Sequence, residues 1–205
     1  MKEYFDKKKV NSIGTYIDQV LGTPSELALA TSAGYPKKEF DNAAKLYKEI
    51  MELRQVSKVA LGRRFSATDA FNYSVEQLKE HYGPVKEIAY ILFEDDREAY
   101  YNLDLSGPRD DSFDGMKTQV RILYEGILGN ANYLADLNKK GISQEHLQAG
   151  LKLHADMLEL KRIQLFVEHE RKEAVQTLLV KVNELEKWHS KAKRIIRAYS
   201  KVKPI

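Results

Sequence analysis

One stretch of this sequence is present twice, and that repetition limits the folds available to the chain. Lys152–Ile163 reads KLHADMLELKRI, and Lys45–Val56 reads KLYKEIMELRQV. Superposing the two at an offset of about 107 residues aligns about fifteen identical residues over about eighty positions without a gap. The identities include Leu21-Gly22 with Leu128-Gly129, Gly34 with Gly141, and Glu52-Leu53 with Glu159-Leu160. A tandem duplication is therefore predicted.

Apolar residues recur at helical spacing through both copies, which predicts an all-α fold. We expect an antiparallel helical bundle built from two tandem pseudo-repeats of about three helices each, combined in one domain. The expected segments are a lead-in at 1–11, a first repeat at 12–93, an acidic linker at 94–118, a second repeat at 119–200 and a tail at 201–205.

The first helix of each copy is expected to end at a glycine. In the first copy it spans Ser12–Ala33 and is broken near Pro24, since proline removes a helical hydrogen bond. The second copy, Lys117–Lys140, has no proline there and is expected to run without that break. Gly34 and Gly141 follow the two helices and are expected to adopt positive φ, because glycine accepts the left-handed conformation.

A second helix is expected at about 36–62 and at about 143–169. Ser66-Ala-Thr-Asp69 resembles a capping box and predicts that a third helix begins there. The matching stretch in the second copy, Glu168–Ala174, contains no glycine, proline or good cap, so the two helices either turn or fuse into one rod of more than fifty residues. A turn is favoured, because a rod of that length needs a partner to cover it.

Composition narrows the functional classes. The chain of 205 residues contains no cysteine, which excludes disulfides, thiolate metal ligands and a cysteine nucleophile. Its N-terminus lacks the apolar core of a signal peptide and no apolar run is long enough to span a membrane, so a cytoplasmic protein is expected. No catalytic set of side chains is recognisable, and neither catalytic residues nor a cofactor are predicted.

Two patterns resemble metal sites but are better explained otherwise. Asp110, Ser112, Asp114 and Gly115 match the start of a calcium loop, but the closing position holds Arg121 in place of a glutamate, which favours an acidic turn at a helix start. Glu186-Lys-Trp-His189 is a single Glu-x-x-His motif without a counterpart in the first copy, whereas di-iron bundles need two. No metal ligands are assigned.

Polar residues interrupt the apolar stripe of the central helix at matching positions in both copies. Since an unpaired buried polar group costs several kcal/mol, each must find a partner or reach the bundle edge. Snorkelling of the cations and bonds to backbone are one explanation, and a polar pocket in each half is the other. The candidate residues for this buried polar network are Tyr47, Arg54, Ser57, His154, Lys161 and Gln164.

The last helix is two-sided, with an apolar face and a face of cations without any acid after Glu186. Such a face attracts anions such as nucleic acid or an anionic membrane surface, although cations near a helix C-terminus also interact favourably with the helix dipole. The candidate anion-binding residues are Lys187, Lys191, Lys193, Arg194, Arg197 and Lys201.

Three stretches, IAYILFEDD at 88–96, LDLSGPR at 103–109 and GISQEHL at 141–147, resemble a group of uncharacterised bacterial all-α proteins. The resemblance implies a helical bundle and no particular activity. From the residues we expect a non-enzymatic structural, assembly or protein-interaction protein, with a protein partner or homo-oligomer. The alternative is a binding module for an anionic partner, and the third possibility is a metal-binding bundle.

Overall fold

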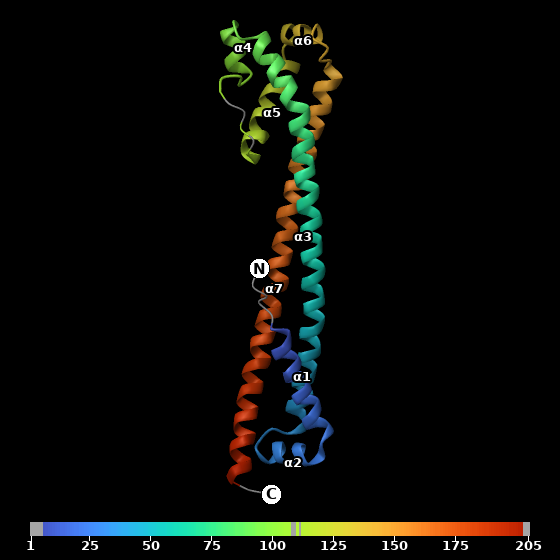
Figure 1. Cartoon of the computed structure of the whole chain (residues 1–205), viewed down its shortest axis with the longest axis vertical. Coiled ribbons are helices and arrows are strands. Elements are labelled where there is room, and N and C mark those ends of the chain that lie inside the picture. Colours follow the sequence, from blue (N-terminus) through green and yellow to red (C-terminus); the bar gives the residue numbers. More distant parts are fainter. Residues whose placement is uncertain (1–5, 108–109, 111, 203–205) are drawn as a thin grey trace. The chain divides into compact units, whose positions relative to one another are not determined.

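The structure is a computed structural model that describes residues 6–107, 110 and 112–202. These residues form helices and no strand, which confirms the all-α prediction. The helices are α1 (Lys7–Gly22), α2 (Pro24–Ser32), α3 (Lys37–Leu92), α4 (Arg97–Asn102), α5 (Phe113–Leu128), α6 (Ala131–Asn138) and α7 (Gln144–Val202) (Figure 1). None of the helices in this part of the chain is long and apolar enough to cross a membrane.

The chain divides into two compact units. Unit 1 comprises residues 1–63 and 168–205, and unit 2 comprises residues 64–167. Each of the two long helices, α3 and α7, therefore contributes its first part to one unit and its last part to the other. Unit 1 contains α1, α2, the start of α3 and the end of α7, and unit 2 contains α5, α6, the start of α7 and the end of α3, together with α4.

Unit 1 is organised by the antiparallel packing of α3 against α7. Glu49 pairs with Lys181 at 3.3 Å and Arg63 with Glu170 at 3.1 Å, so residue numbers rise along one helix as they fall along the other. Helix α1 lies against both, and its buried side chains join theirs in one apolar cluster. That cluster consists of Val10, Ile13, Ile17, Ala43, Ile50, Leu178, Val182 and Leu185.

Unit 2 repeats the arrangement with the roles of the long helices exchanged. Helix α5 packs between the end of α3 and the start of α7, and its Tyr124 is fully buried. The Phe113 ring meets Phe71 of α3 at a centroid distance of 5.8 Å. The unit's core is larger because α4 and the turn after it add Ala99, Leu103 and Leu105.

Both predicted glycine turns are confirmed. Gly34 has φ +87° and Gly141 has φ +85°. The following residues, Tyr35 and Ile142, donate their backbone N–H groups to the carbonyls of Ala30 and Leu137, at 2.9 and 3.1 Å. These six-to-one bonds close Schellman motifs that end α2 and α6.

The predicted break near Pro24 is also confirmed, but the prediction that the second copy lacks such a break is wrong. Thr23 separates α1 from α2, with Pro24 at the start of the new helix. In the second copy α5 ends at Leu128 and α6 starts at Ala131. The Asn130 side chain caps α6 by accepting hydrogen bonds from the N–H groups of Asn132 and Tyr133. The cap satisfies backbone N–H groups at the start of the new helix, so the break occurs without a proline.

The turn predicted between the second and third helices is wrong in both copies. Helix α3 runs through Gly62 and the Ser66–Asp69 sequence without interruption, and α7 is continuous for 59 residues. A rod of this length needs cover, and within each unit the other long helix provides it. Pro84 lies inside α3, which continues to Leu92.

The segment boundaries at the termini and in the middle also differ from expectation. Asp6 caps α1 and Val10 is fully buried, so the described part of the expected lead-in belongs to the fold. The expected linker, 94–118, contains α4, the buried Leu103 and the first turns of α5, because its apolar residues cover one end of unit 2. At the other end Lys201 and Val202 are still in α7, while 203–205 lie outside the described residues.

Candidate anion-binding face

The strongest candidate site is the basic face of the last turns of α7. One side of these turns is held against α1, α2 and α3 by buried or half-buried residues, including Leu185, Trp188, Ala192 and Ile196. The Trp188 ring meets Phe40 at a centroid distance of 5.4 Å in an edge contact. Because this side is fixed to the core, the six predicted cations are all exposed.

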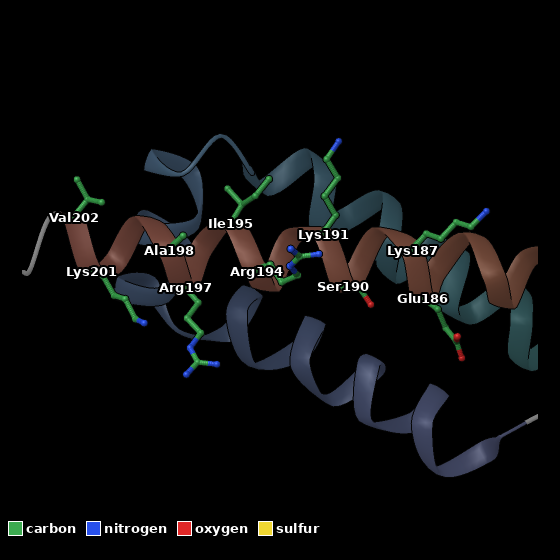
Figure 2. A pocket seen from close by; sticks show the side chains of 10 residues that line it. All are labelled: Glu186, Lys187, Ser190, Lys191, Arg194, Ile195, Arg197, Ala198, Lys201 and Val202. Carbon is green, nitrogen blue, oxygen red and sulfur yellow. The ribbon is translucent and has the colours of Figure 1, made fainter.

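Five of these cations line one shallow surface depression on α7. Figure 2 shows Lys187 and Lys191 leaving the helix on one side, Arg197 and Lys201 on the other, and Arg194 between them. The remaining lining residues are Glu186, Ser190, Ile195, Ala198 and Val202. The depression is therefore a property of one helix surface, open to large partners, and does not enclose a small ligand.

The sixth cation is oriented differently. The Nζ atom of Lys193 lies 5.8 Å from the centre of the Tyr16 ring on α1, at the edge of the basic face. The nearest acid, Glu186, is engaged by Lys9 of α1 at 2.5 Å and so does not neutralise the residues that follow it. The positive charge of α7 between Lys187 and Lys201 is left uncompensated by acids of its own helix.

Charge is distributed unevenly between the two units. Residues 1–63 and 168–205 hold 21 lysines and arginines against 13 acids, a net charge of +8. Residues 64–167 hold 12 against 17, a net charge of −5, and the two values sum to the chain's +3. The nearly neutral total thus conceals a basic unit and an acidic unit, and charge of one sign gathered on a surface attracts the opposite sign.

Glu186 and His189, the Glu-x-x-His pair, are separately engaged. Glu186 pairs with Lys9, while the His189 ring makes an edge contact with Tyr16 at 5.0 Å. Burial and the nearby Lys193 lower the pKa of His189. No group of three His, Cys, Asp or Glu side chains able to hold a metal occurs among the residues described.

The three first-copy members of the expected polar network lie in unit 1 and make separate interactions. The Tyr47 ring packs on Gly14 of α1, so closely that a Cβ on that glycine would lie 2.6 Å from the ring Cζ. The Ser57 hydroxyl donates to the Ala174 carbonyl of α7 at 3.3 Å. Arg54 is half-buried. The Tyr47 ring thus contacts α1 and the Ser57 hydroxyl contacts α7, in two separate interactions.

The three second-copy members lie in unit 2, and two of them are joined. Lys161 donates from Nζ to Gln164 Oε1 at 2.9 Å, and Gln164 donates to the Thr68 hydroxyl at 3.4 Å. The Lys161 ammonium also lies 4.7 Å from the centre of the Phe71 ring. His154 is separate: its Nε2 donates to the Lys117 carbonyl at 2.9 Å, and burial lowers its pKa.

The segment that resembles a calcium loop forms a helix start. The Ser112 hydroxyl caps α5 by accepting from the Gly115 N–H at 3.1 Å, and Asp110 accepts from the Ser112 N–H at 2.9 Å. Hydrogen bonds from Ser112, first from its backbone N–H and then from its side chain, lower the pKa of Asp110. The acids thus stabilise the N-terminus of α5.

A group of side chains that the sequence analysis did not single out lies in unit 2. His81 Nδ1 is 2.8 Å from the Tyr124 hydroxyl, and the His81 ring stacks on His146 at 4.1 Å. Burial lowers the pKa of His81 and raises that of Tyr124. Gly150 makes room for this group, since a Cβ there would lie 2.7 Å from Tyr124 Cζ. The repeat offset places His81 opposite Trp188 and Gly150 opposite Ala43, so sequence comparison alone gave no signal for it.

Comparison of this chain with protein-family models, with curated proteins and with solved structures finds no match.

Proposed function

We propose that this protein is a non-enzymatic helical assembly protein, a duplicated scaffold whose long helices bind other protein surfaces. The observation that carries the proposal is a set of large apolar side chains left exposed along α3 and α7. On α3 they include Val56, Val59 and Tyr73, and on α7 Ile163, Phe166 and Val180. Large exposed apolar side chains that recur along an element are typical of protein interaction surfaces.

These exposed residues occupy equivalent positions under the repeat offset. Val56 corresponds to Ile163, Val59 to Phe166 and Tyr73 to Val180. Scattered surface apolar residues need no explanation, but the same pattern in both copies indicates a shared requirement. Since both copies keep apolar side chains at these exposed positions, we infer that each long helix binds a partner there.

The duplication itself is part of the proposal and is supported by the helix boundaries. Adding 107 to the bounds of α1, α2 and α3 gives 114–129, 131–139 and 144–199, against observed bounds of 113–128, 131–138 and 144–202 for α5, α6 and α7. Buried residues correspond as well. Pairs buried in both copies include Ile13 with Val120, Ile17 with Tyr124, Phe40 with Leu147, Ile50 with Met157 and Leu78 with Leu185.

Sedimentation velocity over a concentration series tests the assembly function. We expect the wild-type chain to form species heavier than 23.6 kDa, and the Val59→Ser/Phe166→Ser double variant to shift toward that monomer mass. Tyr101→Ser is the matched control, because Tyr101 is 63 % exposed but lies on the short helix α4. Equal association of the double variant and the control would contradict the role assigned to the long helices.

A second candidate function is binding of an anionic partner through the basic face of α7. It is favoured by the six exposed cations at 187–201 and the +8 charge of unit 1. A salt titration of binding to duplex DNA and to anionic vesicles tests it. Affinity that falls steeply with salt supports this function, since counterions are released when phosphates are neutralised.

A further inference from the structure

We propose that the anionic partner of the basic face is the acidic face of a second copy of this chain. The basic stripe consists of Lys187, Arg194 and Lys201 on α7. The acidic stripe consists of Glu80 and Glu87 on α3 and Glu94 in the turn that follows it. This inference rests on the proposed assembly function and names one of its interfaces.

The two stripes match in spacing. Successive members are seven residues apart, which on a helix is nearly two turns and a rise of about 10.5 Å. The backbone positions of Lys187, Arg194 and Lys201 therefore share one face of α7, and those of Glu80 and Glu87 share one face of α3, while Glu94 lies just beyond the end of α3. The stripes are also equivalent under the repeat offset, because Glu80, Glu87 and Glu94 correspond to Lys187, Arg194 and Lys201. At each of these positions the two copies carry opposite charges.

When one stripe lies beside the other, the shared helical spacing allows Glu80 and Glu87 to pair with two cations of α7 at once, and Glu94, in the turn after α3, is the third acid of the stripe. The middle pair, Arg194 with Glu87, is the same whether the two helices run parallel or antiparallel. The outer pairs exchange partners between the two orientations. Complementary charges in register set partner choice between helices, as they do at the flanking positions of coiled coils.

The charges are available to a partner. All six residues are exposed. Within the described part of the chain, Lys187, Arg194, Lys201, Glu87 and Glu94 form no ion pair or side-chain hydrogen bond, and Glu80 accepts a single bond from Gln77 at 3.3 Å. Docking therefore does not require these residues to give up an ion pair with another of the described residues.

Each stripe also carries exposed apolar side chains that a docked helix would cover. Tyr90 and Ile91 lie between Glu87 and Glu94, and Ile91 is 61 % exposed. Ile195 lies beside Arg194, and Val202 beside Lys201. Surface ion pairs alone contribute little to binding, whereas apolar contact flanked by paired charges supplies both affinity and register.

The contact joins different surfaces of the two copies. Each copy that binds through its basic stripe still carries an acidic stripe, and the reverse is also true. The contact can therefore propagate into open chains or rings, or be made twice, reciprocally, in a two-fold dimer.

The test uses two charge-reversal variants of the 205-residue chain. Variant K187E/R194E/K201E carries two acidic stripes, and variant E80K/E87K/E94K carries two basic ones. Biolayer interferometry at low salt measures each variant against itself and against the other. We expect the mixed pair to bind at least tenfold more tightly than either variant binds itself, and to lose that advantage at 0.5 M salt, where exposed charges are screened.

The control variant K45E/K48E/K58E changes the net charge by the same amount on exposed lysines of α3 and is expected to bind the wild-type chain as the wild type does. The milder K187Q/R194Q/K201Q variant serves if the reversed chain does not retain its helical circular dichroism. It is expected to bind the wild-type chain at least threefold more weakly than the control does.

Equal binding of like and mixed pairs overturns the inference. So does a result in which the basic stripe binds duplex DNA or anionic vesicles while the mixed pair of variants binds no more tightly than the like pairs. A failure of the assembly function is distinguishable from this result. If the assembly function is wrong, the Val59→Ser/Phe166→Ser double variant associates as the wild type does, whatever the charge variants do.

Discussion

Gly34 and Gly141, 107 residues apart, have the same backbone conformation and end equivalent helices with the same hydrogen-bond pattern. The left-handed backbone conformation costs a residue with a Cβ roughly 1–2 kcal/mol. Glycine has no Cβ and avoids this cost. Neither glycine has another heavy atom within 4 Å of the position a Cβ would take, so the requirement for glycine lies in the backbone alone.

Replacing either glycine by valine is therefore expected to destabilise the protein by about 1 kcal/mol or more. The matched control is Gly62→Ala, since Gly62 lies inside α3 with open space around it. In a helix interior alanine is favoured over glycine by about 0.5–1 kcal/mol, so this control should stabilise. Urea unfolding measures all three, and an equal effect of the three substitutions would contradict the assigned conformations.

Gly150→Ala is expected to destabilise unit 2 for a different reason. The new Cβ would overlap the buried Tyr124 ring and lie 2.8 Å from His81 Cε1, and overpacking of this kind costs about 1–3 kcal/mol. A second substitution, Tyr124→Leu, removes the obstructing ring. Thermal unfolding should show a smaller effect of Gly150→Ala in the Tyr124→Leu background than in the wild type.

Stability should decrease as the pH falls below about 6.5, because burial lowers the pKa of His81, His154 and His189 in the folded protein. The unfolded chain then binds protons that the folded chain excludes. The contribution is fully present above the unfolded pKa and is lost as the pH falls through the folded values.

His154→Gln isolates one part of this effect, since glutamine keeps an N–H donor for the Lys117 carbonyl and does not titrate. Around His154, Arg121 and Lys117 lower the pKa and Glu125 raises it, both less than burial does. Urea unfolding between pH 5 and 7.5 should show a shallower pH dependence in the variant. An unchanged slope would show that His154 is not the group that titrates.

Substitutions of Lys161 test how much this half-buried side chain contributes to the stability of unit 2. Its ammonium lies over the Phe71 and Phe113 rings, at 4.7 and 5.4 Å, and bonds to Gln164. Lys161→Met keeps the apolar stem and removes the charge, at an expected cost of about 0.5–1 kcal/mol. Lys161→Ala also loses the packing of the stem and should cost more. Equal stability of the wild type and both variants would contradict this role.

Local signals predicted the parts of the fold that depend on one or two residues. Gly34, Gly141 and Pro24 each restrict the backbone directly, and the structure agrees at all three. The cap at Ser66–Asp69 is a weaker preference, and α3 continues through it because α7 covers the helix within each unit. Tertiary packing overrode the local preference there.

In the candidate site, too, features of a single helix were predictable and contacts between distant helices were not. The exposed cations of α7 followed from the two-sided pattern of one helix, which sequence periodicity reports well. The His81–Tyr124 contact depends on α5 packing between two helices far apart in the sequence, which periodicity does not report. The acidic stripe could be found by aligning the two copies of the sequence, since Glu80, Glu87 and Glu94 occupy the repeat positions of Lys187, Arg194 and Lys201.

A crystal structure of the 205-residue chain tests the duplication most directly. The Cα atoms of residues 12–93 should superpose on those of 119–200 without a gap, with α1, α2 and α3 on α5, α6 and α7, and with Leu53 and Leu160 at equivalent depth. A different helix order in the two halves, or a superposition that needs an insertion inside the repeats, would contradict the duplication and the assembly function built on it.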